Sequence, residues 1–194
     1  MFRKSRTLLV ASVIGLLGFG FICYLIVRPV AQARKDLQLL ATTQVGVTTG
    51  DEFRKMAVGS GFRLNESLNT YGVTYHNRIL QYFHLAPPTI LLMNARIVGG
   101  VVEGISVRGD VGRSREFAKI SIDERDAHQT NCGDMPVCIQ QTSSTTETIV
   151  FFHPATPLAR REQLLSLNTW CLAKLGGCRS NRELFPGVWQ GEQR

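Results

Sequence analysis

The sequence lacks the short motifs that usually reveal a reaction or a cofactor. No H-E-x-x-H, G-x-S-x-G, phosphate-binding loop or dinucleotide-binding pattern occurs, and no C-x-x-C pair is present. These absences remove the most recognisable zinc hydrolases, serine hydrolases, nucleotide-binding enzymes and thiol oxidoreductases. We therefore assign no catalytic, cofactor-binding or metal-binding residue, and the expectation is a protein that is not an enzyme.

Acidic residues are absent from the first 28 positions, which hold Arg3, Lys4, Arg6 and Arg28. The whole chain has 22 basic and 15 acidic residues, so this short segment supplies four of the seven net positive charges. A nucleic-acid-binding protein normally shows a concentrated basic face with interleaved aromatic side chains. The basic excess instead flanks an apolar run, and nucleic acid is not expected as a partner.

Charged residues are also absent from Leu8–Val27, which reads LLVASVIGLLGFGFICYLIV. A helix of 20 residues is about 30 Å long, which matches the hydrocarbon thickness of a bilayer. A helix also satisfies its own backbone hydrogen bonds in lipid. The segment is therefore predicted to be a transmembrane anchor, with the bilayer as its partner and with an exit at Arg28-Pro29, because proline disfavours helix at the preceding residue.

A cleaved signal peptide is the competing interpretation, since Ala31-Gln32-Ala33 has the small-x-small form of a cleavage site. The apolar run is longer than the ~7–15 residues of most signal peptides, which favours a retained anchor. Basic residues lie on both sides of the run, so charge alone barely decides its orientation. Within the run, Ala11, Gly15 and Gly18 form a small-residue face through which two anchors could pack.

The rest of the chain has the pattern of one α+β domain. Thr49-Gly50-Asp51-Glu52 predicts a capping box at the start of a short helix. Runs rich in β-branched residues predict strands, and Gly99-Gly100 predicts a hairpin turn between two of them. The expected strands are Val73–Leu85, of which Asn77–Leu85 could instead be a helical turn, then Thr89–Val98, Val101–Val107, Phe117–Ile122 and Thr148–Phe152.

A long helix is predicted after the last strand. Thr156 is its expected cap, Pro157 its first residue and Gly176-Gly177 its end, with Leu164, Cys171 and Leu175 on its apolar stripe. The tail after it contains Phe185 and Val188, which are expected to dock on the domain. The fold class is thus α+β: a transmembrane helix followed by a small antiparallel sheet with a packed C-terminal helix.

These features divide the chain into five parts. They are a basic flank (1–7), the anchor (8–27), a juxtamembrane helix or linker (28–46), an extracytoplasmic α+β domain (47–178) and a C-terminal tail (179–194).

Cysteine usage supports an extracytoplasmic position for the domain. Outside the anchor, which holds Cys23, four cysteines form two close pairs, Cys132/Cys138 and Cys171/Cys178. Paired cysteines are typical of disulfides in oxidising compartments. Three connectivities are possible, and the local pairs are favoured. A zinc site is the alternative, but gaps of five and six residues exceed the usual ligand spacing.

The other polar candidates have ordinary interpretations. His76, His84, His128 and His153 lack the spacing of metal ligands. The cluster 123–126 has the pattern of a solvated turn. The polar stretch 123–147 exceeds the usual length of a structureless loop, so it is expected to be functional or disordered unless a Cys132–Cys138 bond ties part of it.

The segment from Val45-Gly46-Val47-Thr48-Thr49 through Asp51–Ala57 to Gly59 resembles the opening motif of the small SmpA/OmlA-type outer-membrane assembly lipoproteins. That resemblance implies a capped helix ahead of a short antiparallel sheet. It covers about fifteen residues, and the lipid-attachment cysteine of that family is missing here.

The leading hypothesis is a single-pass anchored protein of the cell envelope, with its domain in the periplasm and a binding, assembly or scaffold role. Its partner would be an envelope protein, or a second copy through the anchor. Two alternatives stay open. One is an envelope enzyme, hydrolase-like, with dispersed catalytic residues; the other is a lipid- or peptide-binding module with an apolar groove between sheet and C-terminal helix.

Overall fold

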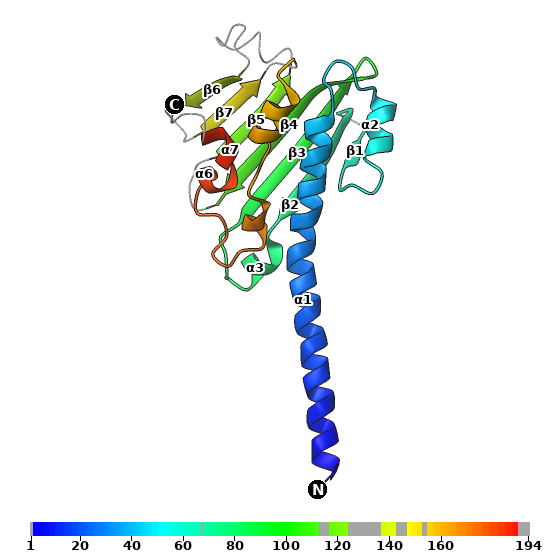
Figure 1. Ribbon diagram of the computed structural model, residues 1–194, viewed down its shortest axis with the longest axis vertical. Coiled ribbons are helices and arrows are strands. Elements are labelled where there is room, and N and C mark those ends of the chain that lie inside the picture. The colour runs from blue at the N-terminus through cyan, green and yellow to red at the C-terminus, as the bar shows by residue number, and fades with distance from the viewer. Residues whose placement is uncertain are drawn as a thin grey trace.

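The computed structural model describes residues 2–66, 68–112, 117–123, 137–142, 147–152 and 155–189, with side chains described for 12–66, 68–112 and 155–188. A long helix, α1 (Phe2–Thr42), projects from a globule built on one sheet (Figure 1). Its segment from Ser12 is long and apolar enough to span a bilayer. The apolar side chains from Val13 to Phe21 are exposed, whereas Val30, Ala33 and Leu37 are buried. One helix therefore contributes both an exposed apolar stalk and a face of the core.

The expected helix exit at Arg28-Pro29 is wrong, because α1 continues through Pro29 for its full 41 residues. Proline removes one backbone hydrogen bond in a helix interior. The stripe of Val30, Ala33, Leu37 and Leu40 packs into the core after it, and this burial favours continued helix. The segments predicted as the anchor and as the juxtamembrane helix belong to a single helix.

The expected capped helix is confirmed as α2 (Gly50–Met56). The Glu52 backbone donates to the Thr49 hydroxyl, and the Thr49 backbone donates to the Glu52 carboxylate. Phe53 on its inner face is fully buried between the rings of Phe62 and Tyr71. The reciprocal cap fixes where this helix begins.

Within the described residues, seven strands form one sheet in the order β1-β2-β3-β4-β5-β7-β6. Neighbours pair antiparallel except β5 and β7, which are parallel, so the sheet is not purely antiparallel as expected. The hairpin turn at Gly99-Gly100 is confirmed, with both glycines at positive φ. The strands are β1 (Arg63–Asn65), β2 (Thr70–His76), β3 (Thr89–Val98), β4 (Val101–Val111), β5 (Phe117–Asp123), β6 (Val137–Thr142) and β7 (Glu147–Phe152).

Two of these strands were not expected. β1 has only three residues, all exposed, so it lacks an alternating pattern. β6 lies inside the polar stretch predicted to be a loop. Of the two options for Asn77–Leu85, the helical turn is the correct one, as α3 (Arg78–Tyr82).

The prediction of one long C-terminal helix is also wrong. The chain forms α5 (Leu158–Leu164), then the 3-10 turn η1 (Thr169–Leu172), α6 (Asn181–Leu184) and α7 (Pro186–Trp189). Pro157, without a side-chain hydrogen bond, takes the cap position predicted for Thr156. The Asn168 backbone donates to the Leu184 carbonyl, so the tail supplies an acceptor where the helix would have continued.

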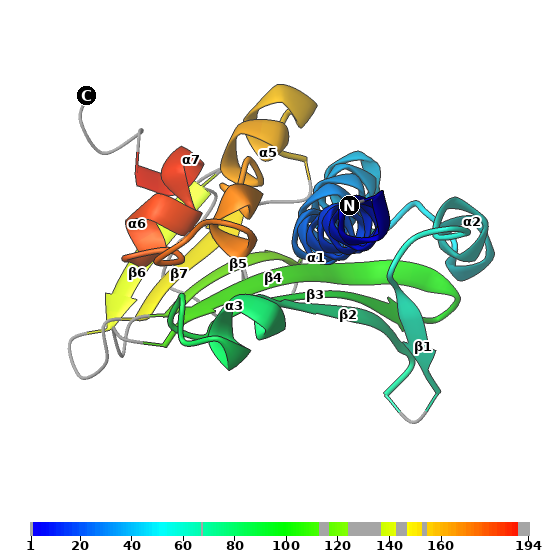
Figure 2. The ribbon, with the colours of Figure 1, turned by 90° about the horizontal axis from the view of Figure 1, so that it is seen from below.

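The core lies between one face of the sheet and these helices. Figure 2 shows α1, α5, α6 and α7 on the same side of the sheet. Along β3, Leu91, Met93 and Ala95 are fully buried, whereas the alternate residues are partly exposed. The tail docks as predicted, with Phe185 and Val188 buried. Gly109 of β4 makes this possible, because a side chain there would collide with Phe185.

Candidate functional site: the junction of the long helix with the globule

A buried carboxylate joins α1 to the sheet. Asp36 on α1 is fully buried, and its Oδ2 accepts from the Tyr75 hydroxyl at 2.5 Å and from the Gly61 backbone at 3.0 Å. Its Oδ1 accepts from the Gln32 side chain at 3.2 Å. A buried carboxylate is costly unless it is hydrogen-bonded, so these donors are required by its position. They hold the helix, β2 and the loop before β1 in one register.

The environment of Tyr75 favours its neutral form. Burial, and then the hydrogen bond to Asp36, raise the pKa of the Tyr75 hydroxyl well above its ordinary value. Gly61 allows this close approach, since a Cβ there would lie 2.5 Å from the Tyr75 hydroxyl and 2.8 Å from Asp36 Oδ2. Asp36, Tyr75, Gly61 and Gln32 therefore form a compact hydrogen-bonded cluster inside an otherwise apolar interface, and we call this cluster the polar lock.

A second buried charged residue, Arg161, binds the C-terminal end of α1. Arg161 on α5 is 4% exposed, and its guanidinium donates to the Thr43 carbonyl and, at 3.5 Å, to the Leu40 carbonyl. Leu40 lies in the last turn of α1 and Thr43 directly follows it, and at this end of a helix a cation is favoured by unpaired acceptors and by the helix dipole. Burial lowers the pKa of Arg161. The helix end is thus fixed by a residue more than a hundred positions away.

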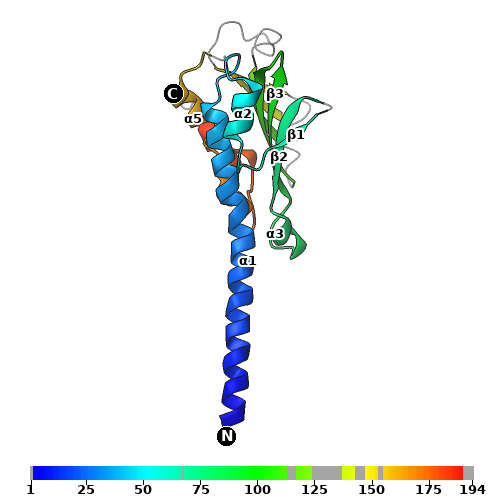
Figure 3. The same ribbon diagram turned by 90° about the vertical axis from the view of Figure 1, so that its right-hand side faces the viewer.

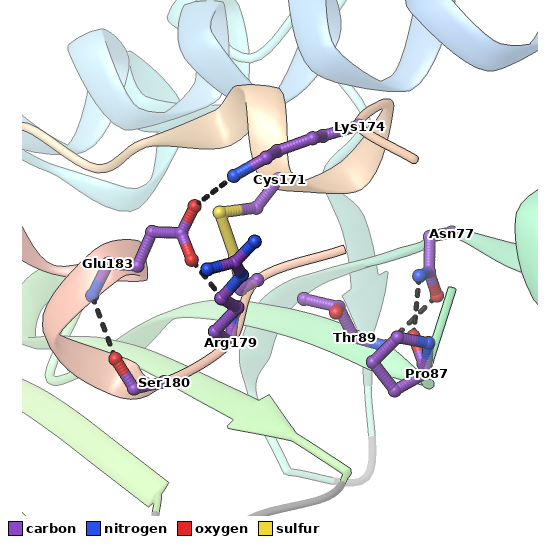
Figure 4. The surroundings of a disulfide bond; sticks show 9 residues. Asn77, Pro87, Thr89, Cys171, Lys174, Arg179, Ser180 and Glu183 are labelled. Atoms are coloured by element: carbon purple, nitrogen blue, oxygen red, sulfur yellow. Dashed lines mark hydrogen bonds and ion pairs between the residues drawn. A yellow bond between two sulfur atoms is a disulfide. The ribbon is translucent and has the colours of Figure 1, made fainter. Parts of the chain in front are cut away.

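A disulfide ties the C-terminal segment together at the other end of the junction. Cys171 in η1 and Cys178 are bonded, with Cα atoms 4.8 Å apart (Figure 4). Beside it, the Lys174 ammonium donates to Glu183 at 2.6 Å, and the Arg179 backbone donates to the same carboxylate at 2.8 Å. The Lys174 hydrogen bond is the main cause that lowers the pKa of Glu183.

Asn77 braces the neighbouring strand ends. Its side chain donates to the Pro87 carbonyl at 2.7 Å and accepts from the Thr89 backbone at 2.9 Å (Figure 4). The loop 83–88 is thereby fixed against the start of β3, in the same region as the disulfide.

Two hollows border the junction. A cavity of about 570 Å³ lies between α1 and α5, and its lining includes the apolar Leu37, Ala41 and Leu165 and the charged Arg34 and Glu162. A wider hollow of about 820 Å³ lies beside α3 and is lined by residues that include Arg78, His84 and Gly176. Neither hollow is the apolar groove hypothesised between the sheet and the C-terminal helix. At the place of that groove, Leu164 and Leu172 are buried in the core.

The polar candidates are not brought together in the described residues. Burial, followed by the charge of Arg78, lowers the pKa of His76. Neither His76 nor His84 makes a described hydrogen bond or ion pair with a carboxylate, and the described residues hold no group of three metal-ligating side chains. His128, His153, Cys132 and most of the 123–126 cluster lie outside the described residues, as does the side chain of Cys138. The Cys132–Cys138 bond therefore stays a prediction.

The small-residue face of the anchor stays a prediction too. Open space surrounds Gly15 and Gly18 within this single chain, and the side chain of Ala11 is outside the described set. Cys23, which lies in the predicted anchor, is a free, half-buried cysteine.

The comparisons with known proteins add no assignment: no protein-family model matches the chain, and no curated protein or solved structure matches it either. The resemblance to SmpA/OmlA-type lipoproteins is thus carried only by the capped-helix segment, whose local structure is that of α2.

Sequence reasoning missed both buried charges. Asp36 follows Ala33 by three positions and precedes Leu37, so it falls on the apolar stripe of α1. A charge on such a stripe is a signal for a buried partner. Arg161 lies on the expected apolar side of α5 beside Leu164, but nothing in the sequence connects it to Thr43.

Proposed function

We propose that this protein is a single-pass membrane-anchored protein that presents its α+β globule outside the cytoplasm and acts by binding or assembling another envelope component. The observation that carries the proposal is the continuity of α1, whose exposed apolar segment leads without a break into the buried stripe of the core. The globule is mounted on its anchor without a linker. Such a mounting suits a protein that holds a partner at a defined height above the membrane.

The polar lock and the Arg161 cap support this proposal, because both fix α1 within the globule. Asp36 sets the rotation of the helix against β2, and Arg161 holds its end. A flexible tether would be sufficient for an enzyme that only needs to stay near a membrane. Two buried charges devoted to one helix are better explained by a need for fixed orientation.

The Cys171–Cys178 bond supports the extracytoplasmic side. Disulfides persist mainly in oxidising compartments, such as the bacterial periplasm. We expect a second bond between Cys132 and Cys138. Thiol counting on denatured protein should then find one reactive cysteine before reduction and five after it. Five reactive thiols before reduction would contradict the assigned compartment.

Membrane insertion and orientation can be tested with two engineered thiols in a Cys23→Ser background. Val47 follows α1 on the globule side and is exposed, and Ser5 lies on the basic flank. A membrane-impermeant maleimide added to intact cells should label Val47→Cys, and label Ser5→Cys only after permeabilisation. The protein should also stay in the membrane pellet after a carbonate wash.

The opposite labelling pattern would overturn the orientation, and release by carbonate would overturn the anchor. The binding role is tested by mild detergent extraction and affinity purification of the full chain. We expect an envelope protein in constant ratio to the chain, and recovery of the chain by itself would count against this role.

A further inference from the structure

An exposed apolar patch lies on the face of the globule nearest the exposed part of α1. We call it the base patch and define it as Tyr82, Phe83, Leu85, Trp170 and Leu175. Their exposed fractions are 79%, 56%, 49%, 53% and 69%. The two loops that carry them are joined by a hydrogen bond of 2.8 Å from the Gly176 backbone to the Leu85 carbonyl. The patch is thus contributed by two segments that are distant in the sequence and joined in the fold.

The position of this patch is set by α1. Figures 1 and 3 show α3 at the end of the globule from which the N-terminal part of α1 emerges. Both α3 and η1 contact α1. The helix itself becomes half-buried at Cys23, Leu25 and Ile26, inside the apolar run. The globule therefore begins at the level of the last turn of the predicted membrane segment.

The rise along α1 places the base of the globule at a similar height. Val30 is the first buried residue of the core stripe, and it follows the last residue of the apolar run by three positions, about 4.5 Å along a helix. The interfacial layer on each side of the hydrocarbon core is about 5–8 Å thick. Side chains at the base of the globule fall within that layer.

The composition of the patch fits a lipid interface. Tryptophan and tyrosine are favoured there because one end of each ring system is apolar and the other is polar. Segments 78–88 and 169–179 contain the basic residues Arg78, Lys174 and Arg179 and no acidic residue. The Lys174 ammonium is paired with Glu183, which lies just outside these segments, so the basic character of the patch comes from Arg78 and Arg179. Basic side chains near a membrane are attracted to anionic headgroups.

We propose that the base patch enters the headgroup–acyl boundary of the same bilayer that α1 spans, so that the globule rests on the membrane. This inference relies on the proposed anchoring of α1. The bilayer is the occupant because the patch is at the height of the lipid interface and is held there by the helix itself. A protein partner on this face would have to displace the lipid below it.

The test uses the full chain reconstituted in vesicles of phosphatidylcholine and phosphatidylglycerol that contain brominated lipid. Trp189→Phe leaves Trp170 as the single tryptophan. Because an interfacial residue is buried only about 5–10 Å, bromine near the glycerol end of the acyl chain should quench about half of its fluorescence. Bromine at the chain terminus should quench less.

Two further single-tryptophan chains, in a Trp170→Phe, Trp189→Phe background, separate the possible outcomes. Phe19→Trp reports on the anchor and should be quenched by deep bromine, whereas Val47→Trp reports on the far end of the globule and should not be quenched. Quenching at position 19 but not at Trp170 would overturn this inference and leave the anchor intact. No quenching at position 19 would overturn the anchor itself.

Two pairs of glutamate substitutions, one in the patch and one outside it, test the patch against a matched control. Phe83→Glu combined with Leu85→Glu should remove the shallow quenching of Trp170, because it charges the patch. Val58→Glu combined with Leu68→Glu changes two exposed apolar residues outside the patch and should leave the quenching unchanged. Thermal unfolding of each variant confirms that the fold is retained. Equal quenching in both pairs would overturn the proposal.

Discussion

At the scale of single residues, Asp36 and Tyr75 concentrate the polar chemistry of the interface between α1 and the sheet. Asp36→Ala leaves the Tyr75 hydroxyl and the Gly61 amide without their acceptor. A buried polar group that loses a charged partner costs about 1.5–3 kcal/mol. We expect the free energy of unfolding to fall by about 3 kcal/mol for Asp36→Ala and by about 1.5 kcal/mol for Tyr75→Phe.

Chemical denaturation in detergent, followed by circular dichroism, measures both losses. Asp51→Ala is the matched control, since the Asp51 side chain is 84% exposed and its ion pair with Arg54 is long at 3.8 Å. That control should change the free energy of unfolding by less than about 0.5 kcal/mol. An Asp36→Ala variant as stable as this control would contradict the role of the lock.

The raised pKa of Tyr75 predicts a loss of stability in alkali. The folded chain keeps this hydroxyl protonated, whereas in the unfolded chain it ionises near pH 10. The stabilising contribution is therefore complete below about pH 10 and is lost as the pH rises above it, with a limiting slope of about 1.4 kcal/mol per pH unit.

Denaturation curves between about pH 9 and pH 11 test this, with each pH compared with the Tyr75→Phe variant. The variant should show a shallower decline, and Tyr82→Phe, which removes an exposed tyrosine, should decline as steeply as the natural chain. Identical slopes for natural chain and Tyr75→Phe would show that Tyr75 does not titrate as expected.

At the scale of elements, sequence patterns succeeded where the decisive contacts are local. The Thr49–Glu52 cap and the Gly99-Gly100 turn depend on residues within a few positions of each other, and both form. The break after α5 depends on the Leu184 carbonyl, and β6 depends on pairing with β7. The polar lock joins Asp36 to Tyr75, which lie 39 positions apart. Such contacts leave little trace in a local pattern.

Proline inside α1 gives an element-scale prediction. Pro29 cannot donate to the carbonyl of Leu25, so the helix carries a defect that packing offsets. Pro29→Ala should raise the free energy of unfolding by about 1–3 kcal/mol, since proline costs about 3 kcal/mol in a helix interior. Thermal unfolding by circular dichroism in detergent measures the gain.

Ala31→Pro is the reciprocal variant at an exposed position two residues further on. It should lower the free energy of unfolding by about 3 kcal/mol. A lower free energy of unfolding for Pro29→Ala would contradict the interpretation that proline is a defect of α1 that packing offsets.

At the scale of the whole molecule, the proposed anchoring makes α1 a rigid support whose length would set the height of the globule. From Arg28 to Thr42 the helix rises about 20 Å, so the loop at Val47 should lie about that far above the membrane. Energy transfer from a dye on Val47→Cys, in a Cys23→Ser background, to a dye on lipid headgroups measures this distance. We expect one narrow distribution.

Insertions between Arg28 and Pro29 separate a stiff support from a tether. Seven helix-forming residues rich in Ala, Glu and Lys should raise Val47 by about 10 Å, because each adds about 1.5 Å and the charges keep the insert out of the lipid. The same insert should lift the base patch and remove the shallow quenching of Trp170.

Seven Gly/Ser residues at the same place should leave the mean distance near its original value and broaden the distribution, because a flexible insert lets the patch return to the lipid. A broad distribution in the chain without an insert would show that the globule is tethered rather than mounted.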